Sequence, residues 1–132
     1  MRRKEPFSLL NRVRSLKYAI FGLKDMILTE HSAWIHVIAT ASVLYCAWWL
    51  EVRGVELALI VIAIALVWSA EVFNTVLEIM ADLVVGQRYS SIVKRAKDIA
   101  AGAVFIACLA AVVIGFLILG PALSQKLNRF FV

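Results

Sequence analysis

Three long apolar stretches constrain the fold of this chain more than any other feature of its sequence. They cover residues 33–50, 57–80 and 99–119, and each approaches the roughly 20 residues that a helix needs to cross a bilayer. The chain has 132 residues, 63% of them hydrophobic, and a mean hydropathy of +0.88. This composition is too apolar for a soluble domain of this size. We therefore predict an all-α membrane protein that forms a single domain, residues 1–132, with three transmembrane helices and a tail at residues 120–132.

The segment before the first apolar stretch, residues 7–30, has the pattern of an amphipathic helix. Its apolar residues recur at alternating steps of four and three, while its charged residues fall elsewhere on the helical wheel. A helix of this kind lies in the headgroup plane of a membrane, with its basic residues near anionic lipid. We therefore predict an N-terminal interfacial helix.

The basic residues are distributed as a topology signal. Seven of them precede residue 33 and four lie between Arg88 and Lys97, against Arg53 alone in the first loop and two in the tail. Cytoplasmic loops of membrane proteins carry an excess of lysine and arginine. We therefore place the N-terminus and the second loop, residues 82–98, in the cytoplasm and the C-terminus outside. With this distribution the formal net charge of +5 does not indicate a nucleic-acid partner.

The second apolar stretch contains polar residues that a membrane helix normally excludes. Glu71, Asn74, Glu78 and Asp82 follow one another at positions i, i+3, i+7 and i+11, which places them on one helical face. A carboxylate near the bilayer centre costs roughly 2.5–3.5 kcal/mol on insertion scales, so such residues usually serve a function. The stripe could be a helix-packing seam. Two carboxylates that flank an amide fit better to a site that handles a cation and a proton.

A further carboxylate could complete a site for a divalent cation. Mg²⁺ prefers carboxylate oxygens together with waters and substrate phosphates, and Glu30 and Glu78 can both lie near the cytoplasmic boundary. Lys97, beside the same boundary, could balance the charge of a polyphosphate. This ensemble is typical of a phosphoryl-transfer site without a Walker glycine loop. His31 and His36 face different directions on a helix, and we interpret them as interfacial packing residues.

The polar stripe also predicts an oligomer. Three membrane helices cannot surround Glu71, Asn74 and Glu78, so neighbouring subunits are needed to screen them from lipid. A non-catalytic oligomeric membrane protein, such as an ion pathway lined by Glu71 and Glu78, is a distant alternative. It leaves Glu30 and the basic cluster around Lys97 without a purpose.

Two segments are similar to the signatures of a known family. Residues 70–82 contain Glu71, Asn74, Thr75, Glu78 and Asp82 in the order E-x-x-N-S/T-x-x-E-x-x-x-D, and residues 95–104 read Arg-Ala-Lys-Asp-Ile-Ala-Ala-Gly-Ala-Val. The N-terminal pattern around residues 17–24 agrees as well. From residue 12 to about residue 119 the chain resembles the small prokaryotic integral-membrane diacylglycerol kinases and their undecaprenol kinase relatives.

The resemblance implies a lipid kinase of the bacterial cytoplasmic (inner) membrane. It implies a homotrimeric helical bundle whose sites are shared between subunits and which transfers the γ-phosphoryl group of Mg-ATP to a membrane lipid hydroxyl. The expected reaction converts diacylglycerol to phosphatidic acid. The alternative acceptor is undecaprenol, giving undecaprenyl phosphate, and His36 and residues 99–103 resemble that branch more closely.

The same resemblance implies a role for each matching residue. Glu71 would be the general base, and Asn74 would orient groups at the reacting centre. Glu30 and Glu78 would hold the Mg²⁺ ion that bridges ATP. The segment Arg88-Tyr89-Ser90 departs from a Glu-Tyr-His element of the family. The remaining expected contacts are Tyr18, Tyr89, Lys97 and Asp98, with Glu30 and Glu78, for the nucleotide, and Arg14, Trp49 and Glu71 for the lipid.

Overall fold

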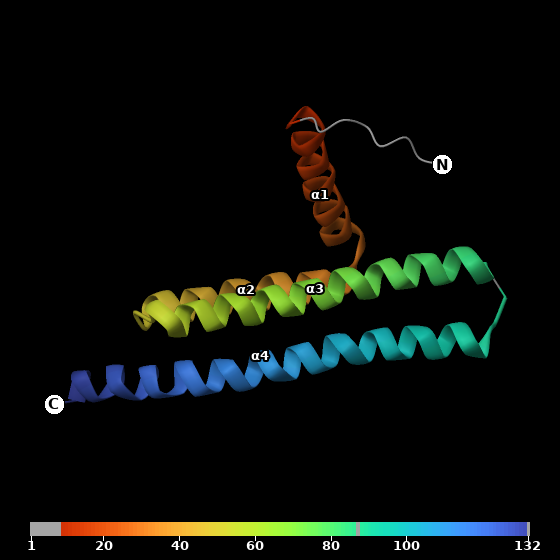
Figure 1. Ribbon diagram of the computed structural model, residues 1–132. Helices are drawn as coiled ribbons and strands as arrows, with labels where there is room; N and C mark the ends of the chain where they lie inside the picture. The colour runs from red at the N-terminus through yellow and green to blue at the C-terminus, as the bar shows by residue number, and fades with distance from the viewer. Residues whose placement is uncertain (1–8, 87, 132) are drawn as a thin grey trace.

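The computed structural model describes residues 9–86 and 88–131, and these residues form four helices (Figure 1). Helices α3 and α4 lie antiparallel, α2 packs beside α3, and α1 projects away from the other three (Figure 1). The all-α prediction is confirmed. The helices are α1 (Leu9–Thr29), α2 (His31–Trp49), α3 (Gly54–Val85) and α4 (Ser91–Phe131).

Helices α3 and α4 are each long and apolar enough to cross a membrane, and among the described helices they alone meet this criterion. Helix α2 has 19 residues and no Asp, Glu, Lys or Arg, but it carries several polar side chains. Most large apolar side chains of α3 and α4 are exposed, and Leu117 for example is 71% exposed. Apolar surface of this extent marks contact with lipid or with other subunits.

Helix α1 covers most of the segment for which an interfacial helix was predicted. Its predicted start at residue 7 lies outside the described residues, and it ends at Thr29 rather than residue 30. Glu30 has extended backbone angles and is the N-cap residue of α2. Along α1 the large apolar side chains are mostly exposed, whereas Met26 is buried. The apolar surface of α1 is therefore free to meet lipid or another subunit.

The two long helices continue beyond the predicted spans. Helix α3 reaches Val85 and α4 begins at Ser91, so most of the predicted loop 82–98 is helical. Helix α4 also continues through Pro121 to Phe131, so the described part of the tail is helical. The spans were delimited by where the apolar run ends, but backbone hydrogen bonds continue through polar residues with adequate helix propensity.

The turn between α3 and α4 positions the basic cluster of α4 beside the end of α3. Gly86 has φ 57° and ψ −126°, a backbone conformation open essentially to glycine alone. The hydroxyl of Ser90 accepts a hydrogen bond from the backbone N–H of Val93 at 3.4 Å, so Ser90 acts as the N-cap of α4. These two residues end one helix and begin the next within a short turn.

The turn between α2 and α3 ends α2 with a Schellman motif. The backbone N–H of Val52 donates to the carbonyl of Ala47 at 2.9 Å, and that of Glu51 donates to Trp48 at 3.1 Å. The side chain of Val52 is buried in the same apolar cluster as Ala47, together with Ile60 and Ile118 of α3 and α4. The turn therefore joins three helices at this end of the bundle.

Glu51 occupies the left-handed position of this motif, with φ 59°, where glycine is usual. We expect Glu51→Gly to raise the free energy of unfolding by about 1 kcal/mol, because a side chain in the left-handed region is strained. Unfolding of the detergent-solubilised protein measures this effect. Glu51→Ala is the matched control, since alanine keeps the strain. An equal gain from both variants would contradict the explanation.

Candidate active site

The buried face of α3 carries a carboxylate. The buried residues of this helix recur at steps of three or four, which is the period of one helical face. Glu71 occupies a position that preceding turns fill with apolar side chains, and it is only 3% exposed. A carboxylate in such surroundings needs hydrogen-bond partners, because its desolvation is costly. The buried residues are Ile60, Ala63, Val67, Glu71 and Thr75.

Two partners of Glu71 come from α2. The hydroxyl of Ser32 donates a hydrogen bond to Oε1 of Glu71, and Nε2 of His36 lies 3.6 Å from Oε2. Ser32 and His36 are one turn apart, so they project from the same face of α2. One carboxylate from α3 therefore lies between a hydroxyl and an imidazole from α2.

Further contacts orient the imidazole of His36. Its ring packs edge-on against the indole of Trp68, with 6.2 Å between the ring centroids, and Nε1 of Trp68 donates to Oγ1 of Thr40 at 3.0 Å. From the sequence, His36 is expected to be an interfacial packing residue and Ser32 is not singled out, whereas the structure places both against Glu71. Their one-turn spacing at the start of the first apolar stretch marks a polar helical face, but it does not show what that face contacts.

Asn74 and Glu78 form a second polar pair on α3. Nδ2 of Asn74 donates a hydrogen bond to Oε1 of Glu78 at 3.0 Å. The oxygen of the same amide, Oδ1 of Asn74, is buried and has no hydrogen-bond partner among residues 9–86 and 88–131. Buried polar atoms are rarely left unpaired. This oxygen is therefore available to a ligand or to a group from another subunit.

The oxygen atoms beside Glu78 suit a hard cation. Mg²⁺ usually keeps several waters and binds one or two carboxylates plus substrate phosphates, instead of a cage made by the protein alone. Within the described ranges, no three Asp, Glu, His or Cys side chains gather closely enough to hold a metal. Glu30 is half-buried in the junction between α1 and α2. Its pairing with Glu78 around a metal stays a prediction.

Lys97 links the ends of α3 and α4. Its Nζ lies 2.5 Å from Oδ1 of Asp82, and this hydrogen bond, together with the charges of Asp82 and Glu78, raises the pKa of Lys97 above its usual value. Lys97 precedes the apolar run that begins at Ile99. The ammonium group of Lys97 therefore stands near Glu78, where it can meet an anion.

The remaining predicted nucleotide contacts lie around the α3–α4 turn. Asp98 forms an ion pair with Lys94 at 2.8 Å, one turn away on α4, and both side chains are more than 60% exposed. Tyr89 is exposed in the turn itself. Exposed ion pairs contribute little stability, so these side chains are free to exchange their partners for a ligand.

Three predicted residues lie apart from this group. Arg14 and Tyr18 are exposed on α1, and within the described part of the chain neither forms a hydrogen bond or ion pair to α3 or α4. Trp49 ends α2, about 25 Å from Ser32 at the rise of an α-helix, and Lys126 lies over its ring at 4.6 Å. One chain alone therefore does not bring these residues to Glu71.

An apolar groove starts at the Glu71 cluster. It has a volume of about 630 Å³, begins at His36 and runs between α2 and α4 as far as Leu123. Its other lining residues are almost all apolar, and they include Val67, Phe116 and Leu119. A polar cluster at one end of a long apolar groove suits an amphiphile, with its polar head at Glu71.

Comparison with known proteins agrees with these features. A diacylglycerol kinase from Synechocystis sp. is 38% identical over 115 residues, which cover 86% of this chain and 66% of that protein. An undecaprenol kinase from Bacillus subtilis is 34% identical over 115 residues, covering 86% of this chain and 93% of that protein. A diacylglycerol kinase from Escherichia coli is 28% identical over 101 residues, 76% of this chain and 82% of that protein.

The chain spans just under two thirds of the Synechocystis protein and most of the other two. The family described as prokaryotic diacylglycerol kinase matches residues 17–119. This match includes the cluster around Glu71, the Asn74–Glu78 pair and the Lys97–Asp82 contact, and it covers well over half of the chain. The chain therefore belongs to the prokaryotic diacylglycerol kinase family, a family of lipid kinases.

Proposed function

We propose that this protein is an ATP-dependent lipid kinase that transfers the γ-phosphoryl group of Mg-ATP to a membrane lipid hydroxyl. The observation that carries the proposal is the buried carboxylate of Glu71, whose partner His36 lines one end of the apolar groove, with Glu78 further along α3 and Lys97 beside it on α4. Phosphoryl transfer depends mainly on positioning and on charge stabilisation. The chain offers a base for the acceptor hydroxyl and a cationic end for the donor.

The proposed reaction uses residues of α2, α3 and α4. The hydroxyl of the acceptor lipid gives its proton to Glu71, its oxygen bonds to the γ-phosphorus of ATP, and the bond from that phosphorus to the bridging oxygen of ADP breaks. Ser32 and His36 hold the carboxylate in place, and Lys97 attracts the phosphates. When bound beside Glu78, Mg²⁺ would neutralise charge on the β- and γ-phosphates.

Diacylglycerol is the acceptor we propose first, and undecaprenol is the second candidate. The relative with the highest identity among the three above is a diacylglycerol kinase, whereas the undecaprenol kinase matches this chain over 93% of its length. Both lipids join a hydroxyl to a long hydrocarbon chain, which the groove from His36 to Leu123 suits. The purified protein should release ADP only when Mg²⁺ and one of these lipids are both present. Release without lipid would contradict a lipid kinase.

Ser32→Ala tests the role of the hydroxyl that holds Glu71. We expect kcat to fall about tenfold, because a hydrogen bond to a charged group is worth about 1.5–3 kcal/mol. Ser42→Ala is the matched control, since that hydroxyl bonds only the carbonyl of Ile38 in its own helix. The ratio of the two kcat values measures the effect. Equal values would argue against Ser32 as a positioning residue.

We also propose that α2 is a third transmembrane helix and that the enzyme forms a homotrimer with shared sites. The enzyme would lie in the bacterial inner membrane with its N-terminus in the cytoplasm. Support for this orientation comes from the basic residues, eleven on the proposed cytoplasmic side against three outside. A reporter fused after Val132 should be active only outside the cytoplasm, and one inserted near Gly86 only inside. The reverse pattern would place the site away from ATP.

A further inference from the structure

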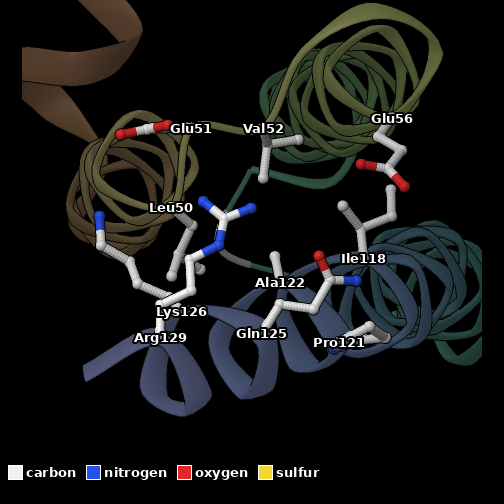
Figure 2. Close-up of a pocket in the computed structure, with 10 residues that line it drawn as sticks. All are labelled: Leu50, Glu51, Val52, Glu56, Ile118, Pro121, Ala122, Gln125, Lys126 and Arg129. Atoms are coloured by element: carbon white, nitrogen blue, oxygen red, sulfur yellow. The ribbon is translucent and has the colours of Figure 1, made fainter. Parts of the chain in front are cut away.

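A polar pocket lies at the end of the bundle opposite the α3–α4 turn. It has a volume of about 400 Å³ and is bounded by the α2–α3 turn, the first turns of α3 and the last turns of α4 (Figure 2). Its floor is apolar and includes Leu50, Val52 and Ile118, whereas its walls carry charged and amide side chains. Pockets of this size accommodate small ligands or headgroups.

The charged side chains of this pocket are not equivalent. Lys126 donates a hydrogen bond to the backbone carbonyl of Trp49 and lies over its indole ring, so it is held in place. Glu51 and Glu56 also line the pocket, whereas the guanidinium of Arg129 points into it from α4 (Figure 2). Within residues 9–86 and 88–131 no hydrogen bond or ion pair engages Arg129. An unpaired guanidinium beside a fixed ammonium attracts an anion.

The position of the pocket along the bundle indicates which leaflet its ligand would occupy. At the rise of an α-helix Glu56, which lines the pocket, lies about 33 Å from Glu78 along α3, close to the thickness of a bilayer core. Trp48 and Trp49 stand at the same level as the pocket, as aromatic residues do at a membrane boundary. The pocket therefore faces the headgroup layer of the leaflet remote from Lys97.

We propose that this pocket binds the phosphate group of a phospholipid in that leaflet, with Arg129 as its main partner and Lys126 as the second positive charge. Guanidinium groups match phosphate oxygens in a two-point geometry. The lipid's hydrocarbon chain can lie against the apolar floor formed by Leu50, Val52 and Ile118.

Half of the pocket comes from residues beyond the family match. Pro121, Ala122, Gln125, Lys126 and Arg129 all follow residue 119, where that match ends. The site is thus built by the C-terminal continuation of α4 and is not part of the kinase machinery described above.

The test measures binding of phosphatidylglycerol to the full-length, detergent-solubilised protein by native mass spectrometry, without ATP. We expect Arg129→Gln to weaken the apparent affinity of one lipid about tenfold, because a charge-assisted, two-point contact is lost. Arg53→Gln is the matched control, since Arg53 is an exposed basic residue of the same turn that does not line the pocket. It should leave the affinity within about twofold.

Competition with inorganic phosphate shows whether the pocket binds the phosphate group of a phospholipid or the free phosphate ion. Millimolar phosphate should not displace the lipid, because free phosphate lacks the apolar contacts. Equal lipid retention by the original protein and Arg129→Gln would overturn the proposal, and so would complete displacement by phosphate, which would make the site one for the free ion. Lipid bound near Glu71 is common to all variants, so the comparison stands whether or not the kinase proposal holds.

Discussion

Glu71→Gln is expected to lower kcat by about 10²–10⁴-fold with little change in the KM for Mg-ATP, because it removes the group that accepts the hydroxyl proton. The amide is isosteric with the carboxylate and can still accept the hydrogen bond from Ser32. Replacing a buried charge by a neutral group should also leave the fold at least as stable. Initial rates at varied Mg-ATP and saturating lipid measure both constants.

Two comparisons make this result specific. Thermal unfolding of Glu71→Gln shows whether lost activity reflects lost structure. Glu78→Gln should behave differently, raising the apparent KM for Mg-ATP, because an amide oxygen binds a hard cation less well than a carboxylate. Equal and mild effects of both substitutions would instead favour the interpretation of the polar stripe as a helix-packing seam.

Mixed oligomers of Glu30→Gln and Glu78→Gln chains are expected to recover activity that neither variant has alone. If Glu30 of one chain and Glu78 of its neighbour hold the same metal, random mixing in equal amounts restores both ligands at about a quarter of the interfaces. Activity should therefore rise toward about a quarter of the original rate as subunits exchange. Rates at several mixing ratios measure this recovery.

The control is a mixture of two Glu78→Gln preparations with different tags, which must stay inactive while the tags show that subunits exchange. A site built within one chain cannot recover, because every chain present is defective. If mixed oligomers form but no activity is recovered at any mixing ratio, the shared site is contradicted. The unpaired Oδ1 of Asn74 is the feature of the single chain that such a neighbour could complete.

The polar face of α3 could be predicted from the sequence because it depends on one helix alone. The spacing of Glu71, Asn74 and Glu78 needs only the helical period, and the structure adds the bond between Asn74 and Glu78. The spacing does not reveal burial. Glu71 is buried against α2, whereas Asp82, on the same predicted face, is exposed beyond the end of α2.

The contacts between helices could not be predicted from the sequence. Ser32 and His36 are isolated polar residues in a largely apolar helix, and their contact with Glu71 depends on how α2 packs on α3. The end of α4 was also missed, because the apolar run stops at residue 119 while the helix continues through Pro121. Hydropathy marks where a helix can lie in lipid, and backbone hydrogen bonding decides where it ends.

The most direct test of the central claim follows the γ-phosphoryl group itself. The purified protein in mixed micelles is given Mg-ATP labelled at the γ-phosphate and either diacylglycerol or undecaprenol, and the organic-extractable lipid is then counted. We predict label in the lipid with one of these acceptors, none without Mg²⁺, and at least a hundredfold less with Glu71→Gln. Label released only as inorganic phosphate, or lipid labelling unaffected by Glu71→Gln, would contradict a lipid kinase built around this carboxylate.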